Sequence, residues 1–286
     1  MFDRFLVPFD GSGPATAALE LAAQIAIGTD ATVHLLYVRD PDESDDDEAV
    51  DATGRTGEEA LSGALDRTSD TDVTVVSDVI QGEPREQILE YATANDIDVI
   101  CMGSHGRQGL GRFVLGSVAE GVVRDAPVPV LVVRASDDVH EVYPFERILV
   151  PTDGSEHAEL ALDRGIELAV EYGASLHLLS VVDLSPYAFD ASAVMVTDRL
   201  EANAKTALEK AAETAADEGL DVQTTVEFGA AHRAISSYAE DEGMDLLVMG
   251  THGHSGLDRY LLGSVTERVL RTAPAPVLTE RVPEDE

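Results

Sequence analysis

Two glycine-rich segments carry the residue types that hold phosphate groups in proteins. The first, Gly103-x2-Gly106-x9-Gly116-Ser117, directly follows the apolar residues 99–102. Glycines can take positive φ and let the backbone approach a ligand without a Cβ in the way. Gly116 and Ser117 stand at the start of a predicted helix, where free N–H groups and the helix dipole favour an anion. The Ser117 hydroxyl is placed there to cap the helix or to bond a phosphate oxygen.

The second segment repeats this spacing with Gly250, Gly253, Gly263 and Ser264. Neither segment is a P-loop or a dinucleotide fingerprint, because no lysine follows the last glycine and the glycine spacing differs from both patterns. Without a lysine or arginine fixed by the motif, little neutralises a transferring phosphoryl group, so we expect little or no hydrolysis. The nearby basic residues are Arg107 and Arg112 in the first segment and His254 and Arg259 in the second.

Asp10 and Asp153 lie in a second repeated motif, Pro-x-Asp-Gly-Ser, at the end of an apolar run. Taken alone, a carboxylate at this place favours an Asx turn or a cap of the helix that follows. The pairing with the glycine segments favours contact with a ligand instead.

Three further residues have chemistry to offer but a simpler structural role. His105 and His252 recur inside the glycine segments, and no His or Cys cluster lies near enough in sequence to suggest a metal site. We expect them to pack the loop or to bond its backbone. Cys101 lies within a predicted strand and is replaced by Val248 in the other segment, which indicates an inert buried thiol.

The motifs recur because the chain is a tandem duplication. Asp10 and Asp153 are 143 residues apart, and Gly103 and Gly250 are 147 residues apart, in the same order. The joint falls near residues 135–144, which include a short polar linker. We therefore predict two domains, residues 1–138 and 139–286.

Apolar runs alternate with helical patterns in each copy. In the second copy strands are expected at residues 147–150, 175–182, 221–227, 245–249 and 276–280, and helices at 156–172, 199–217, 231–242 and 265–271. Alternating strands and helices predict an α/β fold with a doubly wound parallel sheet covered on both faces. In such sheets ligands bind at the carboxyl ends of the strands, where both glycine segments begin.

The two motifs together, at this separation, resemble the universal stress protein family over essentially the whole chain. The resemblance implies two tandem five-stranded domains of Rossmann-like, adenine nucleotide alpha hydrolase-like fold. In that family the long glycine motif marks the ATP-binding branch, so the resemblance implies one ATP site per domain in a stress-response protein.

The residues that the resemblance assigns to nucleotide binding fall into matched sets. Asp10 and Asp153 would lie near the ribose and phosphates, through Mg²⁺. Val38 and Val181 match the position whose backbone groups hold the adenine edge. The remaining residues shape the turn, line the pocket or cradle the phosphates: Pro8, Met102, Gly103, Gly106, Gly116, Ser117 and Val118 in the first domain, and Pro151, Met249, Gly250, Gly253, Gly263, Ser264 and Val265 in the second.

The charge balance excludes several classes of partner. The chain has 55 acidic and 19 basic residues and a formal net charge of −36. Such a surface repels phosphate backbones and anionic membranes, so we expect no nucleic-acid or membrane partner. An acidic surface that is poor in lysine is typical of proteins from halophiles that accumulate salt, and an acidic mesophilic protein is the alternative. Residues 40–48 contain seven acidic residues and are predicted to be a solvated loop, with cation binding as the minority interpretation.

Location and assembly follow from the same features. No apolar stretch approaches the roughly 18 residues of a membrane helix. The N-terminus lacks a signal-peptide pattern, and a single cysteine cannot form an internal disulfide, so a cytoplasmic protein is expected. Residues 128–133 are too apolar for an open strand edge. We expect the two halves to form an internal pseudo-dimer through residues 128–133 and 276–280, with a further homodimer left open.

The sequence leaves open two alternatives to a nucleotide-binding regulatory protein. One is a slow ATPase or an enzyme of adenylate chemistry, because the fold alone does not decide activity. The other is an interaction module that binds no nucleotide. AMP, ADP and cyclic nucleotides also remain possible ligands.

Overall fold

The computed structural model describes residues 2–40, 57–68, 73–106, 114–134, 143–184, 193–253 and 261–282. The chain divides into two compact units, Met1–Val139 and His140–Glu286. Each unit is an α/β sandwich built on a parallel sheet. The acidic residues 41–48 and the basic residues Arg107, Arg112, His254 and Arg259 lie outside the described residues.

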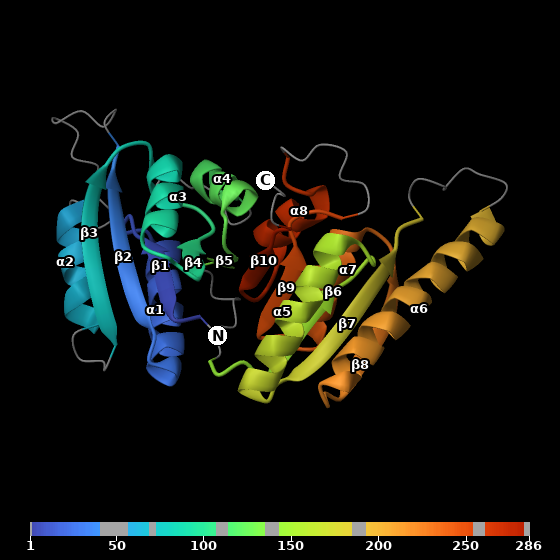
Figure 1. The fold of residues 1–286 in the computed structure, drawn as a ribbon. Coiled ribbons are helices and arrows are strands. Elements are labelled where there is room, and N and C mark those ends of the chain that lie inside the picture. Colours follow the sequence, from blue (N-terminus) through green and yellow to red (C-terminus); the bar gives the residue numbers. More distant parts are fainter. Residues whose placement is uncertain are drawn as a thin grey trace. The chain divides into compact units, whose positions relative to one another are not determined.

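Unit 1 alternates strands and helices along the chain (Figure 1). Its elements are β1 (Arg4–Pro8), α1 (Gly13–Thr29), β2 (Thr32–Arg39), α2 (Gly57–Thr68), β3 (Thr74–Gln81), α3 (Pro84–Ala94), β4 (Val99–Gly103), α4 (Ser117–Asp125) and β5 (Val130–Val133). The strand order is β3-β2-β1-β4-β5, and the neighbours are parallel. The order reverses between β1 and β4, so this sheet is doubly wound and has its switch point there.

Unit 2 repeats this topology. Its elements are β6 (Arg147–Pro151), α5 (Glu156–Tyr172), β7 (Ser175–Val182), α6 (Ala193–Asp217), β8 (Val222–Phe228), α7 (Ala231–Asp241), β9 (Leu246–Gly250), α8 (Ser264–Thr272) and β10 (Val277–Glu280). The strand order is β8-β7-β6-β9-β10, again parallel between neighbours. The switch point lies between β6 and β9. The predicted fold class is confirmed in both units.

The two faces of each sheet are covered by different helices. In unit 1, His34 registers with Leu6, and Leu6 registers with Ile100, so the three share one face. The His34 ring contacts Tyr91 of α3 on that face. Cys101, the next residue of β4, therefore points to the opposite face, where its Sγ donates to the Ala18 carbonyl of α1 at 3.2 Å. The thiol is fully buried, as predicted.

The helices after the first strands begin with side-chain caps. Ser12 precedes α1, and its Oγ accepts from the Ala15 N–H at 3.3 Å. Ser155 does the same for α5 through the Ala158 N–H at 3.4 Å. These caps occupy helix N–H groups that have no partner within the helix. The Pro-x-Asp-Gly-Ser motif thus ends a strand and starts a helix in each unit.

Most predicted boundaries agree with the structure to within one or two residues. Helix α5 and strand β7 match their predicted ranges, and the exception is α6, which begins at Ala193 rather than Arg199. Residues 193–198 of the sequence include β-branched residue types, which have low helix propensity. That cost is only a few tenths of a kcal/mol per residue, and an established helix can extend through it.

Candidate functional site

Each unit contains a cavity at the carboxyl ends of its strands. The cavity of unit 1, cavity 1, has a volume of about 480 Å³ and lies at the switch point between β1 and β4. The cavity of unit 2, cavity 2, has a volume of about 520 Å³ and lies between β6 and β9. Both volumes fall in the range of small-molecule and cofactor pockets. The position is the one expected for ligands of a doubly wound sheet.

The structure brings every predicted site residue to one of these cavities. Cavity 1 is lined by Pro8, Asp10, Val38, Met102, Gly103, Gly106, Gly116, Ser117 and Val118. Cavity 2 is lined by Pro151, Asp153, Val181, Met249, Gly250, Gly253, Gly263, Ser264 and Val265. These residues come from three strand ends and one helix start that are far apart in sequence. Their role in holding a nucleotide stays a prediction.

The aspartate of each motif both closes a turn and borders the cavity. Oδ1 of Asp10 accepts from the Ser12 N–H at 2.9 Å, which is the geometry of an Asx turn. Oδ2 of the same carboxylate lies 2.5 Å from the point where a Cβ on Gly106 would stand. Asp153 repeats this arrangement in unit 2: it accepts from the Ser155 N–H at 3.0 Å and lies against Gly253. One oxygen is therefore engaged by the turn while the other faces the glycine segment.

The glycines at the ends of β4 and β9, and those just after them, let neighbouring atoms approach the backbone closely. They are not needed for an unusual backbone conformation. Gly103 and Gly106 do not have positive φ, so that part of the sequence interpretation is wrong. A Cβ on Gly103 would stand 2.7 Å from the Ala15 nitrogen, and one on Gly250 would stand 2.7 Å from Cβ of His157. Real Cβ atoms do not approach so closely, so only glycine fits. The strand end therefore lies directly against the start of α1 or α5.

The start of α4 faces cavity 1 without a side-chain cap. Gly116 is the N-cap residue, and its N–H donates to the Ser104 carbonyl at 2.8 Å. The first helical hydrogen bond runs from the Glu120 N–H to the Gly116 carbonyl. The N–H groups of Ser117, Val118 and Ala119 therefore have no partner within the helix. The N-terminal ends of α1 and α3, in contrast, are capped by the side chains of Ser12 and Glu83.

Helix α8 repeats this in unit 2, with Gly263 as its N-cap and no side-chain cap. The Gly263 N–H donates to the Thr251 carbonyl at 2.9 Å. Ser117 and Ser264 are the first helical residues rather than caps, so the predicted capping role of Ser117 is wrong. The alternative, a bond from the hydroxyl to a ligand, stays a prediction.

Val38 presents backbone groups to the cavity because β1 ends before it does. The Phe9 N–H donates to the Leu36 carbonyl at 2.8 Å, which is the last contact of that pairing. On the other side, the Gly82 N–H donates to the Arg39 carbonyl at 3.0 Å. Successive residues of a strand direct their N–H and C=O groups to alternate sides. The N–H and C=O of Val38 therefore point to the side that β1 has left.

Val181 has the same relationship to its neighbours in unit 2. The Thr152 N–H donates to the Leu179 carbonyl at 2.8 Å, and the Gly229 N–H donates to the Val182 carbonyl at 3.1 Å. The backbone of Val181 is thus directed toward the open side of β7. Each cavity contains one donor and one acceptor of fixed spacing at this end.

The histidines of the two cavities are held by the loops. Nε2 of His252 donates to the Leu261 carbonyl at 2.6 Å, and its Nδ1 lies 3.1 Å from the Thr251 hydroxyl. This confirms the prediction that His252 bonds the loop backbone. His105 contacts the Ser104 hydroxyl at 3.1 Å. Burial lowers the pKa of His105, the charge of Arg134 lowers it further and Asp10 opposes both, so we expect an uncharged ring near neutral pH.

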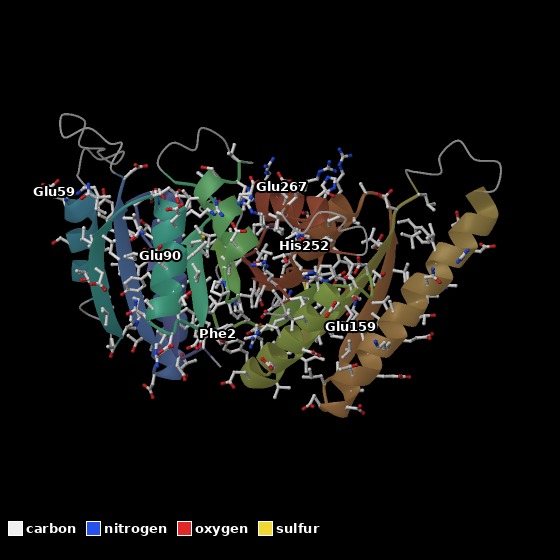
Figure 2. The ribbon with its side chains drawn as sticks, turned by 45° about the horizontal axis from the view of Figure 1, so that its top comes forward. Phe2, Glu59, Glu90, Glu159, His252 and Glu267 are labelled. Carbon is white, nitrogen blue, oxygen red and sulfur yellow. The ribbon has the colours of Figure 1, made fainter. Side chains whose placement is uncertain are left out.

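Unit 2 has a second histidine, His157, beside His252, which is labelled in Figure 2. The rings of His157 and His252 have centroids 5.0 Å apart. Burial lowers the pKa of His157, and the neighbouring His252 lowers it further, against Glu156 and Asp153. His157 occupies the place of Pro14, and neither residue is among those that line the cavities.

The side wall of each cavity comes from a helix whose place in the cavity lining was not predicted from the sequence. Pro84 and Ile88 of α3 line cavity 1, and Ala231 and Ile235 of α7 line cavity 2. Both pairs are spaced i, i+4 and therefore share one face of their helix. The available signal was their matching position in the two repeats, directly after the third strand of each.

The described lining of cavity 1 contains the carboxylates of Asp10 and Asp40 together with His105, and it contains no lysine or arginine. No group of three or more metal-ligating side chains occurs among the described residues. Within this described lining, a polyphosphate would meet no lysine or arginine. An oxygen ligand such as Asp10 suits Mg²⁺, which commonly uses one or two carboxylates together with phosphate oxygens and water.

Comparison with known proteins identifies the family. The model of the universal stress protein family matches residues 1–134 and, a second time, residues 144–281. The chain belongs to the universal stress protein family. It carries the family domain twice, as the internal repeat indicated.

Relatives of this universal stress protein match one repeat or the whole chain. A universal stress protein of Methanocaldococcus jannaschii is 36% identical over 145 residues, which cover 50% of this chain and 85% of that protein. A universal stress protein structure from Archaeoglobus fulgidus is 22% identical, covers 98% of this chain and 99% of its own, and has a TM-score of 0.68. A Pseudomonas aeruginosa PAO1 structure is 21% identical, covers 98% of this chain and 92% of its own, and also has a TM-score of 0.68. At these identities the two structures support the fold alone.

No helix of this universal stress protein, within the residues that the structure describes, is long and apolar enough to cross a bilayer.

Proposed function

We propose that this universal stress protein binds one ATP in each unit and uses the bound nucleotide as a regulatory ligand in the stress response. The observation that carries the proposal is the uncapped start of α4 and of α8. In both units this helix start faces a cavity that a valine backbone borders from β2 or β7. Such a cavity offers amides to an anion at one end and a donor–acceptor pair to a base at the other.

The phosphates would lie at the helix start. The N–H groups of Ser117, Val118 and Ala119 are available there, and the positive end of the helix dipole adds to their attraction for an anion. Gly106 and Gly116 border the same cavity and would present backbone to the phosphates. Ser264 and Val265 with Gly253 and Gly263 supply the same features in unit 2.

The adenine base would lie at the opposite end, beside Val38 or Val181. One N–H and one C=O of the same residue match the donor–acceptor edge of adenine, and Ile88 or Ile235 offers an apolar surface to the ring. Asp10 and Asp153 would lie near the ribose and phosphates and hold Mg²⁺. The metal would neutralise charge that no lysine or arginine of the described lining neutralises.

The same lining supports slow or absent hydrolysis. In the described part of cavity 1, Asp10, Asp40 and the uncharged His105 are the only titratable groups, and no arginine reaches into it. Phosphoryl transfer depends on cations that stabilise the charge of the transition state. We therefore expect ATP to act as a ligand rather than as a substrate.

Titration calorimetry of the full chain with Mg-ATP in molar KCl tests the proposal, and two bound nucleotides per chain are expected. The matched variants are Ser117→Pro and Ser117→Ala. Gly116 has φ −69° and ψ 149°, which a following proline allows, and proline is favoured at the first helical position. Ser117→Pro therefore removes one amide from the helix start without breaking the helix, whereas Ser117→Ala keeps the amide and removes the hydroxyl.

We expect Ser117→Pro to weaken binding in unit 1 by about tenfold, the equivalent of one hydrogen bond to a charged group. Ser117→Ala should weaken it less, and Ser264→Pro should affect only the other site. A chain that binds no ATP, ADP, AMP or cyclic nucleotide would refute the proposal and favour the interaction module. Turnover at or above roughly 1 s⁻¹ would favour the enzyme instead. Assembly of the two halves into a pseudo-dimer, and a further homodimer, stay predictions.

A further inference from the structure

A tyrosine hydroxyl connects the same two elements in both units, away from the cavity lining. In unit 1 the Tyr91 hydroxyl of α3 lies 3.0 Å from Nδ1 of His34 in β2. In unit 2 the Tyr238 hydroxyl of α7 lies 3.0 Å from Nδ1 of His177 in β7. Both tyrosines are more than nine-tenths buried. A polar pair kept in both repeats between a helix and the strand next to the sheet edge is a specific anchor rather than general apolar contact.

The direction of the hydrogen bonds in unit 1 follows from the third partner. The Tyr91 hydroxyl donates its one hydrogen to Oδ2 of Asp78 in β3 at 2.5 Å. Its oxygen must then accept from His34, so His34 carries its hydrogen on Nδ1. A bond to a carboxylate is shorter and stronger than a bond between neutral groups. One hydroxyl thus connects α3 to two neighbouring strands.

The anchor of unit 2 lacks the charged partner. Thr225 occupies the place of Asp78, and its hydroxyl lies 3.4 Å from the Tyr238 hydroxyl. Nε2 of Gln223 donates to the same hydroxyl, also at 3.4 Å. These bonds are longer, and both partners are neutral. The chain therefore contains a strong and a weak form of one anchor.

The anchored tyrosine lies on the stripe of the helix that forms the cavity wall. Pro84, Ile88 and Tyr91 are spaced i, i+4 and i+7 on α3, which places them on one face. Pro84 and Ile88 line cavity 1, whereas Glu90, labelled in Figure 2, is exposed on another face of the helix. Ala231, Ile235 and Tyr238 have the same spacing on α7. A shift of the tyrosine would therefore move the residues that border the base end of the cavity.

We propose that Tyr91 and Tyr238 are positioning residues of the two nucleotide sites, and that the carboxylate of Asp78 makes the wall of cavity 1 more rigid than that of cavity 2. This inference rests on the proposed nucleotide binding. The tyrosines touch no ligand themselves. They fix where Ile88 and Ile235 stand relative to the backbones of Val38 and Val181.

The charged groups around each histidine decide how the anchors respond to pH. His34 faces Tyr91 of α3, Asp78 of β3 and Arg4 of β1; burial lowers its pKa, Asp78 opposes this and Arg4 adds to it. Burial also lowers the pKa of His177, with Glu242 opposing and Arg147 adding. Both rings are therefore uncharged near neutral pH, and the anchors described above are the neutral-pH arrangement.

The test compares Tyr91→Phe and Tyr238→Phe in the full chain in molar KCl. Each substitution removes the hydroxyl and keeps the ring. Tyr91→Phe should weaken Mg-ATP binding in unit 1 by about tenfold, which corresponds to one hydrogen bond to a charged group. Tyr238→Phe should weaken unit 2 by only about threefold, because its bonds join neutral groups. The site in the other unit is the internal control in each case.

Replacing Asp78, the third partner of Tyr91, by the threonine found at its place in unit 2 separates positioning from general destabilisation. In Asp78→Thr the additional effect of Tyr91→Phe on affinity should fall to that of Tyr238→Phe, a non-additivity that a double-mutant cycle measures. The Nδ1–H signal of His34 in nuclear magnetic resonance spectra should be lost in Tyr91→Phe. A purely structural role would lower stability additively and would leave the affinities unchanged.

Two outcomes would overturn the inference. One is unchanged nucleotide affinity in Tyr91→Phe despite a lower melting temperature. The other is unchanged hydrogen exchange of the Ile88 amide in that variant, which would show that the wall does not depend on the hydroxyl. If the unmutated chain binds no nucleotide, the proposed function fails by itself, and the exchange of the Ile88 amide still decides whether Tyr91 anchors α3.

Discussion

Oδ2 of Asp10 lies 2.5 Å from the point where a side chain at position 106 would begin. The other oxygen of this carboxylate is held by the Ser12 N–H, so the Asp10 side chain has little freedom to move away. Gly106 therefore lets the carboxylate lie directly against the backbone of the glycine segment. Any larger residue must displace either Asp10 or the glycine segment, and both border cavity 1.

We predict that Gly106→Ala weakens nucleotide binding in unit 1 by at least about tenfold while costing only about 1 kcal/mol of stability, the low end for a tight core insertion. Gly253→Ala, where the corresponding distance is 2.6 Å, should have the same effect in unit 2 only. Calorimetry with Mg-ATP measures the two sites together with their stoichiometry.

Gly173→Ala is the control for this prediction. Gly173 has φ +64° at the end of α5, and nothing lies within 4 Å of the added Cβ. Alanine there costs about 1 kcal/mol through backbone strain, without touching either cavity. Equal losses of affinity in Gly106→Ala and Gly173→Ala would attribute the effect to stability and contradict the role of the Asp10–Gly106 contact.

The sequence motifs predicted the residues that strand ends and helix starts bring to the cavities. They did not predict the side walls that α3 and α7 supply. The repeated motifs place Asp10, Gly106 and Ser117 at the ends of strands and at a helix start, and a parallel sheet brings those points together whatever lies between them. Pro84 and Ile88 belong to no motif. In sequence, their i, i+4 spacing indicates only a buried helix face, and the adjoining strand end becomes visible only in the folded unit.

The anchors are harder still to predict, because His34 and Tyr91 are 57 residues apart and neither has a motif around it. The capping role expected of Ser117 was wrong for a different reason. Whether a serine caps a helix or begins it depends on one residue of register, and Gly116 takes the cap position here. Composition and periodicity do not resolve differences of that size.

Arg164 and Glu280 form an ion pair inside unit 2 that should control stability. Nε of Arg164 lies 2.6 Å from Oε1 of Glu280, whose side chain is only 7% exposed. We predict that Arg164→Met costs roughly 3 kcal/mol at neutral pH, because it leaves a buried carboxylate without that partner. The double variant Arg164→Met/Glu280→Gln should recover much of this loss. Urea unfolding of the unmutated chain, Arg164→Met, Glu280→Gln and the double variant completes the cycle, and additive losses would contradict the coupling.

The same carboxyl predicts a pH dependence of stability with a definite sign. Burial raises the pKa of Glu280, and Arg164 only partly opposes this. The folded chain therefore holds this proton to a higher pH than the unfolded chain does, so stability falls as pH rises from the unfolded pKa through the folded one. Glu280→Gln should remove this decline, which begins above about pH 4. A variant with an unchanged pH profile would rule out Glu280 as the source.

The thiol of Cys101 should be unreactive in the folded chain. Its side chain is fully buried, and its Sγ donates a weak hydrogen bond to the Ala18 carbonyl. We predict that a maleimide labels the thiol only as fast as the chain unfolds, and that Cys101→Val changes stability by less than about 1 kcal/mol, because Val248 fills the same place in unit 2. Labelling in urea is the control. Rapid labelling of the folded chain would contradict the buried position.

The net charge of −36 predicts that stability depends steeply on salt. Folding brings the excess carboxylates together, and their repulsion is screened only when the Debye length becomes shorter than their separation. The melting temperature should therefore rise with KCl and level off near about 1 M, where the Debye length is roughly 3 Å. Sucrose at equal osmolality is the control, because it strengthens burial without screening charge.

Replacing the exposed Glu213 and Glu218 by glutamine should lower the KCl concentration needed for the same melting temperature. A melting temperature that rises equally in sucrose, or that is unchanged by these substitutions, would show that repulsion among carboxylates does not limit the stability of this fold.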